Sequence, residues 1–163
     1  MQYSVRYTSF QNATTFNGGF VQELFLQFAQ INSSPRHREE PNAAVSIRVR
    51  YYDESYASDW EVYMGGLPAD KVGRDVIVTW KSYDIDNNKT FYTDSNGLEM
   101  QKRILNFKES YNFSTFEQIS GNYYPINSAI AIVDSKSQLQ MTVLNDRSQG
   151  GAVLEKGKIE LMQ

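Results

Sequence analysis

The stretch Val45–Tyr52 reads Val-Ser-Ile-Arg-Val-Arg-Tyr-Tyr and carries the clearest structural signal in the chain. Every second residue is apolar or aromatic, whereas Arg48 and Arg50 place two guanidinium groups on the opposite side. Successive side chains of a β-strand point to opposite faces. The stretch therefore predicts an antiparallel strand with one face buried and one face in water.

The same period of two recurs outward along the chain and predicts about nine or ten strands in all. The further segments are 3–7, 20–30, 60–64, 76–80, 129–133, 139–143 and 159–161. Clusters of turn-forming residues separate them, at 17–19, 65–68, 94–97 and 149–151. Within 20–30, Phe25 falls on the polar face and needs a neighbouring side chain to cover it. Short, regularly spaced strands predict an all-β fold, an antiparallel β-sandwich.

Bulk composition narrows the class of protein further. The chain has 163 residues, enough for one domain with a real core, and 13% of them are aromatic, which favours strands. Its 16 Lys and Arg are scattered among 19 Asp and Glu, so a nucleic-acid partner is not expected. No apolar run approaches the roughly 20 residues that span a bilayer, so no membrane partner is expected either.

Four Asn-x-Ser/Thr sequons occur, at Asn12, Asn32, Asn88 and Asn112, and none has proline in the middle. Chance explains any single one of them in a chain rich in Asn, Ser and Thr. Four together predict glycosylation of a secreted or lumenal chain. Because the N-terminus has no hydrophobic leader, we expect Met1 to begin a fragment of a longer protein.

Metal and nucleophile chemistry finds little support. The single histidine, His37, lies between two arginines, where a divalent metal would be repelled, and there is no cysteine. The acidic run 84–88 resembles a calcium loop, but Lys89 and Ser95 stand where that loop needs Gly and Glu. Two carboxylates could still serve glycoside hydrolysis, and Asp94 and Asp146 lie in the two most distinctive turns.

Three segments resemble signatures of glycoside hydrolase family 38. They read Phe-Tyr-Thr-Asp-Ser-Asn-Gly at 91–97, Gly-Asn-Tyr-Tyr-Pro-Ile-Asn-Ser at 121–128 and Leu-Asn-Asp-Arg-Ser-Gln-Gly-Gly at 144–151. They occur in the family's order and at about its spacing, and the third is more similar to the lysosomal branch than to the Golgi branch. The chain departs from the family at Leu98, where a basic residue is common, at Asn145, where Thr is usual, and at 151–153.

This resemblance implies the antiparallel sandwich of the family's C-terminal half, part of its galactose-mutarotase-like supersandwich, either as a single domain over 1–163 or as a fragment. In the family, a zinc ion held by two His and two Asp, and an Asp nucleophile, lie in an N-terminal α/β domain. None of those motifs occurs here, so the resemblance implies no catalytic residue and no metal site in this chain, which alone is expected to be inactive.

The implied parent is a lysosomal or secreted α-mannosidase that acts on N-glycan mannosides. Its remaining domains are the expected partners, and a face exposed by their absence would favour self-association.

The signature turns also make sense as structure. The segment 94–97 suits a type I turn with Asp first and Gly last. In the third signature, Asp146 and Arg147 are expected to hold the turn by hydrogen bonds, and its two glycines to supply positive φ. A substrate-facing role is the alternative, and its candidates are Asp94, Tyr124, Asp146 and Arg147.

A second hypothesis comes from a different class of protein. Aromatic rings on a sandwich stack against sugars, so Tyr52, Tyr63, Tyr123 and Tyr124 would suit a free-standing carbohydrate-binding or interaction module without enzyme activity. The competing interpretation is that these tyrosines pack against neighbouring domains.

Overall fold

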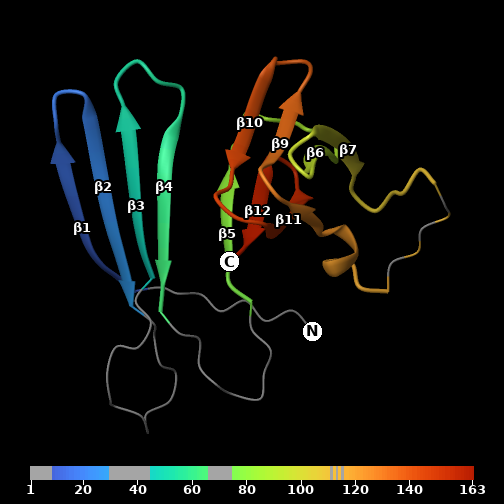
Figure 1. Ribbon diagram of the computed structural model, residues 1–163, viewed down its shortest axis with the longest axis horizontal. Coiled ribbons are helices and arrows are strands. Elements are labelled where there is room, and N and C mark those ends of the chain that lie inside the picture. The colour runs from blue at the N-terminus through green and yellow to red at the C-terminus, as the bar shows by residue number, and fades with distance from the viewer. Residues whose placement is uncertain (1–8, 30–44, 66–74, 111, 113, 115) are drawn as a thin grey trace, which may run out of the picture. The chain divides into compact units, whose positions relative to one another are not determined.

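The computed structural model describes residues 9–29, 45–65, 75–110, 112, 114 and 116–163 (Figure 1). The chain divides into two compact units, 1–72 and 73–163, and the single domain expected over 1–163 stays a prediction. The described residues form twelve strands in three four-stranded sheets, and every pairing is antiparallel. The predicted all-β antiparallel fold is therefore confirmed. Within these residues no helix has the length and hydropathy needed to cross a membrane.

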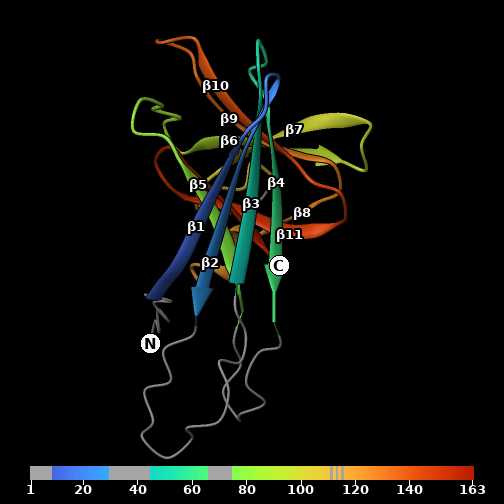
Figure 2. The same ribbon diagram turned by 90° about the vertical axis from the view of Figure 1, so that its left-hand side faces the viewer.

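The first unit contains one sheet in which the strands follow one another in chain order (Figure 1, Figure 2). Its strands are β1 (Ser9–Asn17), β2 (Val21–Ala29), β3 (Val45–Tyr52) and β4 (Ser58–Met64). The predicted strand 45–52 coincides with β3, and the segments 20–30 and 60–64 contain most of its two neighbours. The predicted turn at 17–19 joins β1 to β2, whereas the predicted strand 3–7 lies outside the described residues.

The two faces of β3 differ as the alternation predicts. Val49 is buried on one face. On the other face, Arg48 and Arg50 form ion pairs with Glu23 of β2 and Glu61 of β4, at N–O distances of 2.6 to 3.4 Å. The Arg48 guanidinium also lies 5.5 Å from the centre of the Phe25 ring and supplies the cover that this aromatic residue on the polar face needs.

The second unit is a sandwich of two sheets, ordered β10-β9-β6-β7 and β5-β12-β11-β8. Their bounds are β5 (Ile77–Lys81), β6 (Thr90–Ser95), β7 (Glu99–Ile104), β8 (Tyr124–Ile126), β9 (Ala129–Asp134), β10 (Leu139–Leu144), β11 (Gln149–Glu155) and β12 (Lys158–Met162), with a short 3₁₀ helix η1 (Ser120–Asn122) before β8. Both sheets contribute to one buried core, which contains Ile85, Phe91, Tyr124, Ile126, Ile130, Ile132, Val153, Ile159 and Leu161.

The alternation pattern did not predict five of the described strands, namely β1, β6, β7, β8 and β11. Thr93 and Asp94 in β6 are polar, yet both are buried. The predicted turn at 149–151 is wrong, because those residues form the start of β11 and pair with β8. Burial of polar groups and the absence of glycine side chains both remove the alternation on which strand prediction depends.

Candidate functional site

The three signature segments meet at one corner of the second unit. The chain crosses from one sheet to the other twice at this place, through Asn127–Ser128 between β8 and β9 and through 145–148 between β10 and β11. The first signature ends β6 beside them. We call residues 94–97, 126–129 and 145–149 the motif corner.

Asp94 is the centre of the motif corner and is only 5% exposed. Its Oδ1 accepts hydrogen bonds from the backbone N–H groups of Asn127, Ser128 and Ala129, at 2.8, 2.9 and 3.1 Å. Its Oδ2 accepts another from the N–H of Gly97, at 2.8 Å. Burial by itself raises the pKa of Asp94, but these four donors outweigh it and lower the pKa from 3.8 to about 2. The carboxylate thus fastens the β6 hairpin to the first crossing.

The β6–β7 turn lies one residue later than the sequence suggests. Asp94 and Ser95 still belong to β6, and the N–H of Leu98 donates to the carbonyl of Ser95 at 3.0 Å. Asn96 and Gly97, the two central residues, have φ of 51° and 72°. Two successive positive φ values identify a type I′ turn, so the predicted type I turn is wrong.

Asn145, which the sequence marks only as a departure from the family, holds the second crossing. Its side-chain Nδ2 donates to the carbonyl of Ile126 at 2.9 Å and also to the carbonyl of Arg147. Its backbone N–H donates to the carbonyl of Ser128 at 3.1 Å. Asn145 therefore links the two crossings. This role can be recognised only from the residues that surround Asn145 in the structure.

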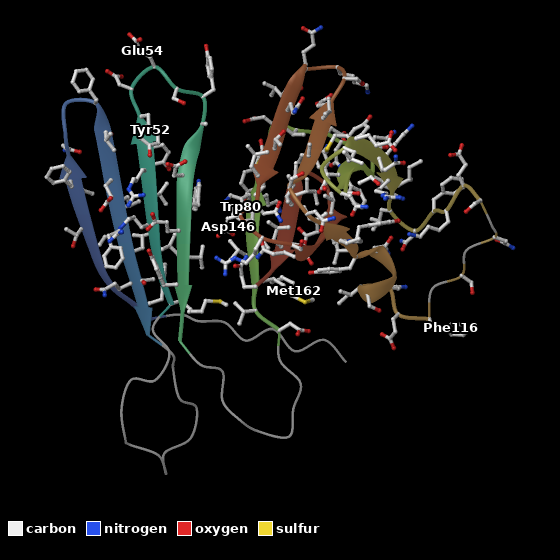
Figure 3. The ribbon with its side chains drawn as sticks, in the orientation of Figure 1. Tyr52, Glu54, Trp80, Phe116, Asp146 and Met162 are labelled. Carbon is white, nitrogen blue, oxygen red and sulfur yellow. The ribbon has the colours of Figure 1, made fainter. Side chains whose placement is uncertain are left out.

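Asp146, labelled in Figure 3, and Arg147 lie on the connection after β10. Both are exposed, as are Asn96, Gly97 and Ser148 of the same corner. The Asp146 and Arg147 side chains are each 74% exposed, and they pair with each other through Nε–Oδ1 and Nη2–Oδ2 contacts of 3.0 and 2.7 Å. The hydrogen bond from Arg147 lowers the pKa of Asp146. The hydrogen bonds expected of these side chains join Asp146 and Arg147 to each other, whereas Asn145 links the two crossings.

Tyr124 faces the interior and is 9% exposed. Its ring meets the Phe91 ring edge to face, with centroids 5.7 Å apart, and its Oη is hydrogen-bonded to the Lys108 ammonium group. The Arg103 guanidinium lies 4.5 Å from the centre of the same ring. Among the four substrate-facing candidates, therefore, Asp146 and Arg147 are at the surface and Asp94 and Tyr124 are inside.

The paired glycines of the third signature make room and do not adopt positive φ. A Cβ on Gly151 would lie 2.6 Å from Cγ1 of Ile126 and 2.8 Å from Cδ2 of Leu161, which is closer than real contacts allow. A Cβ on Gly150 would lie 3.2 Å from the Tyr123 ring. The predicted role in turn geometry is wrong, and the glycines instead permit close packing across the sandwich.

The donor groups of the described residues do not fit a zinc ion. No group of three or more His, Asp or Glu side chains is placed to hold a metal within that part of the chain, and His37 lies outside it. In the acidic run 84–88, Asp86 pairs with Lys156 at 2.8 Å. The Asp94 oxygens are already engaged by backbone donors.

The second unit is an antiparallel two-sheet sandwich, and the buried carboxylate of Asp94 holds its motif corner together. These features are typical of a domain with a structural role. Comparison with known proteins then identifies it: residues 4–163 match the model of the glycosyl hydrolases family 38 C-terminal domain. The chain belongs to this family, and the predicted resemblance is confirmed.

The individual relatives that the chain matches are α-mannosidases. An α-mannosidase from Arabidopsis thaliana is 39% identical over 124 residues, which are 76% of this chain and 12% of the relative. The lysosomal α-mannosidases of guinea pig (Cavia porcellus) and Homo sapiens are 39% and 38% identical over 115 residues, 70% of this chain and 11% of each relative. The matching part of the chain thus spans only about an eighth to a ninth of the length of these enzymes.

Proposed function

We propose that this chain is a non-catalytic scaffold portion of a zinc-dependent, retaining α-mannosidase that hydrolyses α-mannosides of N-glycans. Membership of the C-terminal family and the names of the relatives support the α-mannosidase part of the proposal. The lysosomal relatives support a lysosomal or secreted parent. In this proposal the zinc ion and the nucleophile belong to a separate catalytic domain, and the chain's partners are the remaining domains.

The contacts of Asp94 carry the scaffold part of the proposal. A catalytic carboxylate in a glycosidase must reach the anomeric carbon or the leaving oxygen of a sugar. Asp94 is buried, and both of its oxygens accept backbone N–H groups. Moving it towards a substrate would break four hydrogen bonds at once. Its chemistry is therefore that of a structural anchor.

Asp146 and Arg147 are the exposed charged groups of the motif corner that another domain, or a substrate held by one, would meet. They present a neutral pair of opposite charges at an exposed crossing. Such a pair breaks and re-forms at little cost, so it suits a polar contact with a neighbouring surface. We propose that they face the remaining domains.

Equilibrium dialysis of the purified chain against zinc tests the proposed division of labour. The proposal predicts no stoichiometric zinc binding, and replacing His37 with Ala should change nothing. Tight binding of one zinc per chain, lost in H37A, would show that a metal centre lies within these residues.

A carbohydrate-binding module is the second candidate, and two exposed tyrosines favour it. Tyr52 and Tyr63, 38% and 52% exposed, lie on the same face of β3 and β4. Each is hydrogen-bonded to a carboxylate, Tyr52 to Asp59 and Tyr63 to Glu61. Tyr124 is buried, and Tyr123 is only partly exposed with its hydroxyl bonded to the buried Glu160, so neither serves this hypothesis. Titration with mannose oligosaccharides decides it, because a saturable shift in the wild type that Y63A removes would support binding, and no shift would exclude it.

A further inference from the structure

Asn88 begins the sequon Asn88–Lys89–Thr90 and lies in the tight turn that leads into β6. The N–H of Thr90 donates to the carbonyl of Asn87 at 2.8 Å, which closes the turn. Asn88 and Lys89 are its central residues, with φ of 44° and 61°. The Asn88 side chain is exposed. The reactive amide of this sequon is thus presented to solvent at the tip of a type I′ turn.

The turn is anchored from beneath by other groups. Asn87 is buried, its Nδ2 donates to the carbonyl of Thr90 at 2.9 Å, and its Oδ1 accepts the N–H of Gly157 at 2.9 Å. Asp86 Oδ1 accepts the backbone N–H of Asn88 at 3.1 Å. None of these contacts uses the Asn88 side-chain amide, so a large substituent there leaves the anchoring contacts intact.

The structure describes the other three sequons less completely. Asn32 and the side chain of Asn12 lie outside the described residues. Asn112 is exposed, but both of its chain neighbours lie outside them as well. Asn88 is the sequon whose asparagine, turn and hydroxyl residue are all described.

We propose that Asn88 carries an N-linked glycan, a modification independent of the mannosidase assignment. The donor is a lipid-diphosphate-linked oligosaccharide in the lumen of the secretory pathway. A bond forms between Nδ2 of Asn88 and C1 of the first sugar, and the bond between C1 and the diphosphate oxygen breaks. The lipid diphosphate leaves with the electron pair, and the amide nitrogen gives up one proton.

A competing explanation exists for the asparagine alone, because Asn tolerates positive φ better than most residues. Thr90 separates the two explanations, since a turn needs no hydroxyl two residues on, whereas glycan transfer does. Its Oγ1 lies 3.4 Å from the Asn88 carbonyl, a long contact that contributes little. Thr90→Ser keeps the sequon and Thr90→Ala removes it, and both retain Asn88.

The test uses the full 163-residue chain, secreted by eukaryotic cells behind a cleavable leader and recovered from the medium. Peptide N-glycosidase in heavy-oxygen water converts a glycan-bearing asparagine into a labelled aspartate, and mass spectrometry locates the label. We expect the label at residue 88 in the wild type and in T90S and none in T90A, with equal thermal unfolding midpoints.

Two results would overturn the proposal. An unlabelled Asn88 in chain recovered from the medium would show that the turn is not glycosylated, whatever the state of the other sequons. Label that persists in T90A would mark spontaneous deamidation instead of a glycan. Because no readout involves mannoside hydrolysis, either failure leaves the proposed function untouched.

Discussion

Replacement of Asp94 by Asn removes the charge that fastens the motif corner and nearly preserves the shape of the side chain. The carboxylate accepts four backbone N–H groups, three on Oδ1 and one on Oδ2. An amide has one acceptor oxygen, so its NH₂ group would have to face an N–H donor. Hydrogen bonds to a charged group each contribute about 1.5 to 3 kcal/mol to stability. We therefore expect D94N to lower the free energy of unfolding by about 2 to 4 kcal/mol near neutral pH.

The lowered pKa expresses the effect of the same four hydrogen bonds as a pH dependence. A pKa lowered from 3.8 to about 2 corresponds to about 2 kcal/mol, at about 1.4 kcal/mol for each tenfold change in proton affinity. Because the folded-state pKa lies below the unfolded one, this stability is fully present above pH 3.8 and is lost as pH falls through about 2. The difference between the wild type and D94N should therefore shrink over that window.

Urea unfolding, followed by tryptophan fluorescence, measures this difference. The two tryptophans lie in different units, Trp60 in β4 and Trp80 in β5, so a Trp60→Phe background makes the signal specific for the second unit. Asp146→Asn is the matched control, since it changes an exposed carboxylate of the same corner, and it should leave the midpoint unchanged. A loss in D94N below about 1 kcal/mol, or one that stays constant down to about pH 2, would refute the assignment of Asp94 as the anchor.

Two further substitutions test the packing around the motif corner. Gly151→Ala should destabilise the second unit by about 1 to 3 kcal/mol, because its Cβ would lie 2.6 Å from Ile126. A urea midpoint equal to that of the wild type would contradict this. Tyr123→Phe should cost about 1 to 3 kcal/mol, because buried Glu160 loses its 2.6 Å hydrogen bond. In the wild type, burial and Glu160 raise the pKa of Tyr123, so an absorbance titration in which every tyrosine ionises near pH 10 would contradict that contact.

Seven of the twelve described strands match stretches predicted from the sequence, and the environment of each strand explains the difference. In β3 one face is apolar, with Val49 buried, and the other carries Arg48 and Arg50, so the sequence alternates and even the strand ends are predictable. In β11, Gly151 packs against Ile126 and Leu161, and a residue without a side chain shows no alternation. Strands whose residues are determined by long-range packing therefore resemble turns in sequence.

The site was predictable in place but not in role. The motifs at 91–97, 121–128 and 144–151 were visible in the sequence, and the structure brings part of each of them to the motif corner. Asp94 and Asp146 look alike in sequence, yet one is buried among backbone donors and the other is exposed beside Arg147. Asn145 was missed because its partners, Ile126 and Ser128, are distant in the chain.

The most direct test of the scaffold assignment is hydrolysis of a chromogenic α-mannoside by the purified chain at acidic pH, with zinc added and with zinc removed. If the chain is a scaffold portion, it shows no turnover in either condition. Zinc-dependent turnover that follows the chain through purification, and that Asp94→Asn abolishes without unfolding the chain, would place the catalytic machinery within these residues and contradict it.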